Sequence, residues 1–258
     1  KNYFEKELDA LISGIEDPTE KVGVVYNFIR NKMTWNGNLG FGSRNGVKKA
    51  YKDKKGNVGD INLMLTAALQ YAGLKANPVL TSTRANGIPV AATISGFNYV
   101  ISAVEIDKEL LLLDATNTIT APGTLPLRTV NWQGRMIMPN GTSTWVDLSP
   151  KVFSRANVLL DAEITEAFTI KGKVRQRLTN YLAYNFRNEN ADLEGEDVVR
   201  NMEEDKGEIE IYDLEIKNLK NLSKPISYSY NYTLENEVEE IGDKLYISPL
   251  LFLASKEN

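Results

Sequence analysis

The sequence predicts an α+β fold in which a central helix packs on an antiparallel sheet, followed by a β-rich accessory domain. Three observations support this. Residues 61–69 are apolar around almost the whole helical circumference, which indicates a buried helix. Strand-like segments follow this helix without another helical period, a pattern typical of α+β domains. After Ser149-Pro150 the charge balance and the hydrophobic pattern both change.

The chain begins with two expected amphipathic helices. Apolar residues recur at helical spacing from Leu8 to Ile15. A second helix is expected to start at Pro18, because Asp17 can cap it, proline is favoured in a first turn, and Glu20 can reach back to the cap. Its apolar residues continue at spacings of three and four. We therefore expect both helices to be buried on one side.

A loop and a short helix should connect this pair to the central helix. Residues 36–46 are rich in Gly and Asn, and a short helix is expected over 47–51. The basic run 48–55 is interpreted as the solvated face of that helix. The segment 56–60 then opens the central helix, and Gly73 is its expected stop.

The rest of the first domain should form an antiparallel sheet. The sequence Asp107-Lys108-Glu109 is expected to turn one strand pair, and Asn140-Gly141 is a strong hairpin signal. The strands are expected at 78–83, 98–106, 110–115, 135–138 and 143–148.

The boundary between the two domains is placed near residue 150. Residues 1–150 contain 16 Lys and Arg against 13 Asp and Glu, and residues 151–258 contain 14 against 21. We therefore expect a domain over 1–150 and an accessory domain over 151–258. In the accessory domain the sequence predicts a long strand over 152–170, helices over 179–187 and 194–205, and strands over 208–216 and around 228–232.

The composition excludes several kinds of chemistry. The sequence contains no Cys and no His. Disulfides, a thiolate nucleophile, a Cys/His zinc site and imidazole acid–base catalysis are thereby ruled out for this chain. Carboxylate, Lys, Tyr or Ser/Thr chemistry, an oxygen-ligand metal site, or no chemistry at all would remain. We expect no cofactor and no metal.

The charge pattern and the hydropathy bear on partners. Neither half of the chain has the concentrated basic character of a nucleic-acid reader, so no nucleic-acid partner is expected. No apolar stretch approaches the ~20 residues that span a bilayer, so no transmembrane segment is expected in this chain. The sequence opens with Lys1-Asn2-Tyr3, without an initiator Met or a signal peptide, and we expect it to be a segment of a longer protein.

Three short motifs occur in a definite order. Gly56-Asn57-Val58-Gly59-Asp60 opens the central helix, Phe97-Asn98-Tyr99-Val100 lies on one strand, and Leu112-Leu113-Asp114-Ala115-Thr116 lies on the next. On these motifs, residues 17–150 resemble the bacterial transglutaminase-like superfamily, which has a papain-like core. They look most like its multidomain, envelope-associated members, which carry a β domain before the core and another after it.

The resemblance implies where a catalytic triad would stand. In that family a Cys at the start of the helix, a His on the next strand and an Asp on the strand after it act together. A helix N-terminus favours the thiolate, the His accepts the proton, and the Asp orients the His. The matching positions here are Val58, Tyr99 and Asp114, at intervals of 41 and 15 residues. Only the Asp is retained.

Neither replacement can carry the family's chemistry. Valine has no nucleophilic atom, and tyrosine, with an ordinary pKa near ~10, is a poor proton acceptor at neutral pH. The resemblance therefore implies a catalytically inactive domain that acts in binding or scaffolding, in the periplasm or cell envelope. An unknown peptide, protein or glycan would occupy the vacated cleft, whose candidate lining residues are Trp35, Asn57, Asp60 and Asn98.

Two other functions remain open on the sequence. Asp60 and Asp114 could form the acid–base pair of a carboxylate-based hydrolase, since paired carboxylates can do this when their environments separate their pKa values. The domain could also be a structural spacer without a ligand. Each residue has a structural interpretation as well: Val58 as core, Asp60 as a stabiliser of the first helical turn, and Asp114 as a turn cap. Trp35, Trp132 and Trp145 could simply pack in the core.

The vacated site also has a predicted geometry. The Tyr99 hydroxyl should lie within hydrogen-bonding reach of Asp114, because the turn at 107–109 pairs their strands and a buried hydroxyl without a partner would cost ~1–3 kcal/mol. Val58 should lie in the first turn of the central helix with its methyl groups close to the Tyr99 ring.

Overall fold

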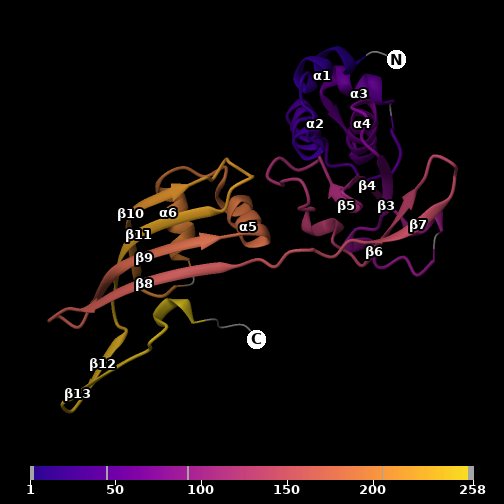
Figure 1. Ribbon diagram of the computed structural model, residues 1–258. Coiled ribbons are helices and arrows are strands. Elements are labelled where there is room, and N and C mark those ends of the chain that lie inside the picture. Colours follow the sequence, from indigo (N-terminus) through magenta and orange to yellow (C-terminus); the bar gives the residue numbers. More distant parts are fainter. Residues whose placement is uncertain (1–2, 45, 92, 205, 255–258) are drawn as a thin grey trace. The chain divides into compact units, whose positions relative to one another are not determined.

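The computed structural model describes residues 3–44, 46–91, 93–204 and 206–254 (Figure 1). The chain folds into two compact units, Lys1–Lys151 and Val152–Asn258. Helices and antiparallel sheets occur together, which confirms the α+β class. No helix in the described part of the chain is both long and apolar enough to span a membrane.

Four helices form one side of the N-terminal unit: α1 (Glu5–Ile12), α2 (Pro18–Lys32), α3 (Val47–Asp53) and α4 (Val58–Tyr71). The Asp17 side chain accepts a hydrogen bond from the Glu20 N–H at 2.9 Å, which confirms the predicted cap of α2. Helix α1 ends before the predicted Ile15, because Gly14 takes a positive φ of 78° and turns the chain. The lysines of the basic run 48–55 are exposed, as predicted.

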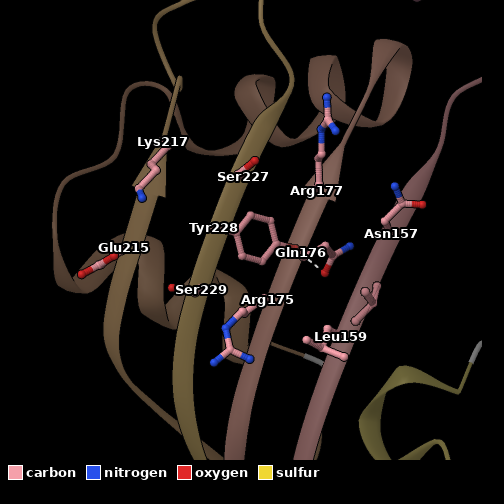
Figure 2. A pocket seen from close by; sticks show the side chains of 11 residues that line it. Asn157, Leu159, Arg175, Gln176, Arg177, Glu215, Lys217, Ser227, Tyr228 and Ser229 are labelled. Atoms are coloured by element: carbon pink, nitrogen blue, oxygen red, sulfur yellow. Dashed lines mark hydrogen bonds between the residues drawn. The ribbon is translucent and has the colours of Figure 1, made fainter.

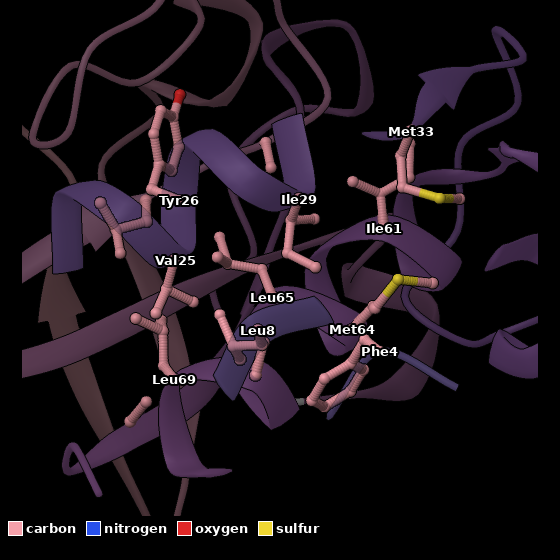
Figure 3. Close-up of a cluster of buried hydrophobic side chains, with 14 of the residues drawn as sticks. Phe4, Leu8, Val25, Tyr26, Ile29, Met33, Ile61, Met64, Leu65 and Leu69 are labelled. Atoms are coloured by element: carbon pink, nitrogen blue, oxygen red, sulfur yellow. The ribbon is translucent and has the colours of Figure 1, made fainter. Parts of the chain in front are cut away.

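Helix α4 is buried between the other helices and a sheet. Leu8 of α1 and Val25 and Ile29 of α2 pack with Leu65 and Leu69 of α4, and all five side chains are fully buried (Figure 3). Its opposite side contacts strands β3 and β4. The prediction of a buried central helix is therefore confirmed.

The sheet of the N-terminal unit has five strands in the order β5-β4-β3-β6-β7, and each neighbouring pair is antiparallel. A separate parallel pair, β1-β2, was not predicted from the sequence. Asp107 and Lys108 both have positive φ and alone form the β4–β5 turn, so Glu109 belongs to β5 rather than to the turn. The strands are β1 (Thr34–Trp35), β2 (Lys55–Gly56), β3 (Ala76–Thr81), β4 (Tyr99–Ile106), β5 (Glu109–Leu113), β6 (Gln133–Ile137) and β7 (Ser143–Asp147).

The C-terminal unit is built on a four-stranded antiparallel sheet in the order β10-β11-β9-β8. The helices α5 (Asn180–Asn190) and α6 (Glu196–Glu203) cover one face of it (Figure 1). A short hairpin, β12-β13, follows the sheet in the chain. The strands are β8 (Ala156–Ile164), β9 (Ile170–Leu178), β10 (Ile209–Lys217), β11 (Ile226–Leu234), β12 (Val238–Ile241) and β13 (Lys244–Ile247). Single 3-10 turns occur at η1 (Arg84–Asn86), η2 (Ile94–Gly96), η3 (Leu127–Thr129) and η4 (Leu251–Leu253).

The prediction of one long strand over 152–170 was wrong. The segment contains strand β8, a turn, and only the first residue of β9. The Thr165 N–H donates to the Thr169 carbonyl at 2.9 Å, and Phe168 takes a positive φ of 58°. This turn therefore reverses the chain without the Gly, Pro or Asn that usually marks such a position.

A glycine in the middle of the C-terminal sheet leaves room for a tyrosine side chain to cross a strand. The Tyr232 hydroxyl of β11 crosses β9 and donates to the Asp161 carbonyl of β8 at 3.2 Å. A Cβ on Gly172 of β9 would lie 1.9 Å from that carbonyl oxygen and 2.9 Å from the hydroxyl. Only glycine leaves room for this crossing.

Candidate functional site

The start of α4 is fixed by a reciprocal pair of hydrogen bonds. The Asn57 Oδ1 accepts from the Asp60 N–H at 2.7 Å, and the Asp60 Oδ2 accepts from the Asn57 N–H at 3.0 Å. This capping box satisfies two N–H groups that the first turn of a helix leaves without partners. Both side chains are buried, so the fold itself uses these two predicted binding residues.

The loop before α4 is held against the same turn. The Ser43 hydroxyl donates to Asp60 Oδ1, and the Asn57 side-chain amide donates to the Gly42 carbonyl at 3.0 Å. A Cβ on Gly59 would lie 2.3 Å from that carbonyl oxygen, so the loop backbone passes directly over the helix start. The first turn of α4 is therefore covered where a helix N-terminus would otherwise be open.

Val58 is the first residue of α4 and is fully buried. It belongs to the same buried apolar cluster as Tyr99. The structure thus confirms that Val58 lies in the first helical turn, and it places Val58 and Tyr99 in one buried cluster. At this position the chain presents methyl groups and no atom that could attack a carbonyl.

Tyr99 and Asp114 meet beside this turn. Tyr99 is the first residue of β4, and Asp114 follows the last residue of β5. The tight turn at Asp107-Lys108 pairs Ser102 with Leu113, which brings the two ends together. The Tyr99 hydroxyl donates to Asp114 Oδ2 at 2.7 Å, and both residues are buried. The predicted hydrogen bond is confirmed.

The carboxylate of Asp114 has three further donors, all on its Oδ1 atom. The Asn62 side-chain amide donates at 3.0 Å, the Thr116 N–H at 2.9 Å, and the Thr116 hydroxyl at 2.6 Å. A buried charge is tolerable only when donors replace the water that it has lost. Four donors do so here, and Asp114 caps its own turn through Thr116, as the structural interpretation of this residue allowed.

Arg128, in η3, joins this network through the two hydroxyl groups that donate to Asp114. Its Nη2 donates to the Thr116 hydroxyl oxygen at 2.6 Å and to the Tyr99 hydroxyl oxygen at 3.0 Å, and its Nε lies 3.2 Å from the latter. An ionised carboxylate can only accept, so both hydroxyl hydrogens are committed to Asp114 and both oxygens accept from Arg128. The hydroxyl groups of Tyr99 and Thr116 thus bridge the Arg128 guanidinium and the Asp114 carboxylate through hydrogen bonds.

The protonation of Tyr99 follows from these surroundings. Burial raises its pKa well above the usual value of 10.0, the negative charge of Asp114 raises it further, and Arg128 opposes the shift. The tyrosine is therefore neutral at physiological pH and donates to Asp114. Tyr99 cannot replace an imidazole as the proton acceptor. Its hydroxyl hydrogen is donated to Asp114, and its oxygen accepts a hydrogen bond from Arg128.

Aromatic rings flank the guanidinium of Arg128. Its central carbon lies 4.5 Å from the centre of the Trp35 ring and 5.5 Å from that of the Tyr99 ring. Trp35 also donates from its indole nitrogen to the Asn38 carbonyl at 3.0 Å. Arg128 therefore lies beside the Tyr99 hydroxyl, and its guanidinium is in contact with the ring of the half-buried Trp35.

Asn98 precedes Tyr99 and has a role of its own. Its Oδ1 accepts from the Thr83 N–H at 2.9 Å, and its side-chain amide donates to the Thr83 hydroxyl at 2.9 Å. This double contact joins the start of β4 to the segment after β3. Asn98 thus has both ends of its amide group engaged within the fold.

A separate polar cavity of about 280 Å³ lies beside the start of α4. Asp60 and Gly56 line it, together with Arg44, Lys49 and Lys55. Val58, Tyr99 and Asp114 are not among its lining residues. The described residues contain no acidic cluster that could hold a metal ion.

The two carboxylates of the hydrolase alternative belong to different networks. Asp60 is bonded to Asn57 and Ser43, whereas Asp114 is bonded to Tyr99, Asn62 and Thr116. They have no hydrogen-bond partner in common within the described ranges. Nothing in this arrangement favours their acting as an acid–base pair.

Sequence reasoning missed Asn62, Thr116 and Arg128. Asn62 carried a usable signal, because it is a polar residue within a helical segment that is apolar around almost its whole circumference. It donates to the Val100 carbonyl at 2.8 Å and accepts from the Ala115 N–H at 2.9 Å, so it ties α4 to β4 and to the segment after β5. Arg128 lies 29 residues from Tyr99, and no local pattern points to it.

Comparison with known proteins supports the family resemblance. Residues 6–109 match the sequence profile of the transglutaminase-like superfamily, a segment that includes Val58 and Tyr99 and ends before Asp114. No curated protein matches the chain. Among solved structures, the chain is similar to the crystal structure of a putative protease from Parabacteroides distasonis, with 11% identity and a TM-score of 0.41. That match covers 96% of this chain and 50% of the other chain. This chain therefore spans about half the length of that protein. Residues 6–109 of the N-terminal unit are therefore similar to the transglutaminase-like superfamily.

Proposed function

We propose that the N-terminal unit is a catalytically inactive transglutaminase-like domain that acts in binding or scaffolding. The observation that carries this proposal is the network of Arg128, Tyr99 and Asp114. Where the family has a proton-accepting His, this chain has a neutral hydroxyl that donates to Asp114 and accepts from Arg128. Both functions of that oxygen are used within the fold.

The nucleophile position supports the same proposal. Val58 is fully buried at the first turn of α4, and the loop that passes over Gly59 covers that turn. Catalysis of acyl transfer needs an attacking atom with access to the substrate carbonyl. A methyl group within an apolar cluster provides neither.

The filling of the site favours scaffolding over binding in the vacated cleft. Arg128 lies beside Tyr99 and against the Trp35 ring, and Asn57, Asp60 and Asn98 form hydrogen bonds within the fold. We propose that the unit acts through its outer surface, in a multidomain exported or envelope protein, toward a peptide, protein or glycan. The location and the multidomain setting rest on the family resemblance.

An amine-incorporation assay tests the absence of catalysis. The chain is incubated with a glutamine-containing protein and a fluorescent primary amine, with an active transglutaminase as the positive control. We expect no incorporation above a reaction without enzyme, and likewise no release of ammonia. Incorporation that persists through purification and disappears in Asp114→Asn would contradict the proposal. An Asp192→Asn variant, which makes the same change at an exposed position in the other unit, serves as the matched control for loss of a negative charge.

A further inference from the structure

One face of the C-terminal sheet is polar and faces away from α5 and α6. Along β9, Ile170, Val174 and Leu178 are buried beneath the helices. The residues between them point to the opposite face, because side chains alternate along a strand. In β9 these residues are Lys171, Lys173, Arg175 and Arg177, and in β11 they are Ser227, Ser229, Asn231 and Thr233.

A groove of about 520 Å³ lies on this face, toward one end of the sheet (Figure 2). The register places Ser227 between Arg177 and Lys217, and Ser229 between Arg175 and Glu215. Serine side chains are short and those of Arg and Lys are long. The surface of this face is therefore recessed along β11 relative to the strands on either side. Asn157 and Leu159 of β8 continue the lining on the far side of β9.

The charges in the groove are unevenly paired. Arg175 forms an ion pair with Asp161 at 2.8 Å. The side chains of Arg177 and Lys217 are exposed, and neither has a hydrogen bond or ion pair with another group in the described part of the chain. Two cations therefore flank the Ser227 hydroxyl with their donors unused. A carboxylate fits this arrangement, because charge-assisted hydrogen bonds from Arg and Lys to carboxylates are strong and directional.

The remaining surface of the groove indicates the kind of ligand. Leu159 is 56% exposed and lines the groove beside Arg175, so it offers an apolar contact next to the cations. The aromatic residue of the lining, Tyr228, is turned to the other face. Its ring stacks on Phe186 at 4.8 Å, and its hydroxyl donates to Gln176 at 2.7 Å. Ligands that bind by stacking on an aromatic ring, such as nucleic-acid bases, are not suited to this groove.

We propose that this groove binds an acidic peptide segment. A Glu or Asp carboxylate of the peptide lies between Arg177 and Lys217 above the Ser227 hydroxyl, and an apolar side chain nearby contacts Leu159. The carboxylate supplies the negative charge that the two cations lack. The proposal concerns the C-terminal unit, so it does not depend on the function proposed for the N-terminal unit.

Binding is measured by fluorescence anisotropy on the full chain, with a labelled hexapeptide of alternating glutamate and leucine as the probe. The same peptide with glutamine in place of glutamate is the charge control. We expect saturable binding of the acidic peptide that weakens with added salt, because two of the contacts are ionic. The double variant Arg177→Gln/Lys217→Gln should weaken binding by about tenfold or more, the size expected for lost charge-assisted contacts.

Two further variants separate the groove from general electrostatic attraction. Lys171→Gln/Lys173→Gln removes the same charge from the same face outside the groove and should change affinity by less than about threefold, as expected for distant surface charges. Ser227→Phe fills the groove without changing charge and should abolish binding. Equal losses in the two double variants would overturn the proposal, as would unchanged binding in Ser227→Phe. Absence of peptide binding, or binding of an acidic oligosaccharide such as oligogalacturonate in place of the peptide, would also overturn it.

Discussion

The two units each place an arginine beside hydroxyl groups, yet the two sites differ in what those groups can still do. In the N-terminal unit, Arg128 donates to Tyr99 and Thr116, which donate in turn to the buried Asp114. In the C-terminal unit, Arg177 and Lys217 flank Ser227 on an open sheet face. The first arrangement is complete within the chain, and the second is complete only with a ligand. Similar residues can thus stabilise a fold or remain available to bind a ligand. Burial and hydrogen bonding within the chain distinguish the two cases.

The comparison has an energetic counterpart. Removing one member of a buried network leaves the others without partners and without water, which costs much more than the bond itself contributes. Removing an exposed, unpaired side chain leaves nothing unsatisfied. Substitutions in the N-terminal site should therefore lower the free energy of unfolding, and those in the groove should not.

The largest effect is expected for Asp114→Ala. It should lower the free energy of unfolding of the N-terminal unit by about 3–5 kcal/mol, because three residues lose their buried acceptor and Arg128 loses the charge that it neutralises. The measurement is urea unfolding followed by tryptophan fluorescence, which reports on this unit because Trp35, Trp132 and Trp145 all lie within it. The groove variant Arg177→Gln/Lys217→Gln is the control and should leave the transition unchanged. A loss below about 1 kcal/mol for Asp114→Ala, the size of an average substitution, would erase the contrast between the sites.

A smaller and pH-dependent effect is expected for Tyr99→Phe. At neutral pH the variant should lose about 1–3 kcal/mol, since Asp114 loses a donor. The folded-state pKa of Tyr99 lies above its unfolded value, so its contribution is fully present below pH ~10 and is lost as pH rises above that value. The difference in unfolding free energy between the wild type and Tyr99→Phe should therefore shrink above pH ~10. A difference that stays constant across this range would show that the hydroxyl proton is not held as described.

The smallest effect is expected for Arg128→Gln. Because Arg128 is half-buried, we expect a loss of about 1 kcal/mol, together with a change in tryptophan emission when the guanidinium leaves the Trp35 ring. Arg135→Gln is the matched control. Arg135 lies 5.0 Å from the Trp145 ring in the same unit and donates to the Ser143 hydroxyl, away from Asp114. Equal losses in the two variants would mean that the hydroxyl bridge to Asp114 contributes nothing beyond stacking.

The parts of the fold that could be predicted from the sequence are those set by near neighbours. The cap at Asp17 and the hairpin turn near Asp107 depend on residues only a few positions apart. The opposition of Tyr99 and Asp114 was predictable because one tight turn joins their strands. The β12-β13 hairpin was missed although Gly242, with a positive φ of 70°, marks its turn.

The parts that could not be predicted depend on contacts between distant residues. Arg128 reaches Tyr99 from a 3-10 turn, and its choice of partner depends on how the whole loop after β5 is folded. The turn between Thr165 and Thr169 is closed by hydroxyl and backbone bonds without a typical turn residue. Composition showed that no Cys or His was available, but it could not show that an arginine takes up the space beside the tyrosine.

The turn at Asp107-Lys108 limits how this chain can change its length. Tyr99 and Asp114 come to the same face of the sheet because the hairpin has no spare residue between β4 and β5. Inserting or deleting a single residue within β4 would turn Tyr99 to the opposite face, and the same change within β5 would turn Asp114 away from Asn62 of α4. Only paired changes, one in each strand, would keep the two residues together. The hairpin therefore brings residues 15 positions apart together, and this geometry needs no reaction at the site.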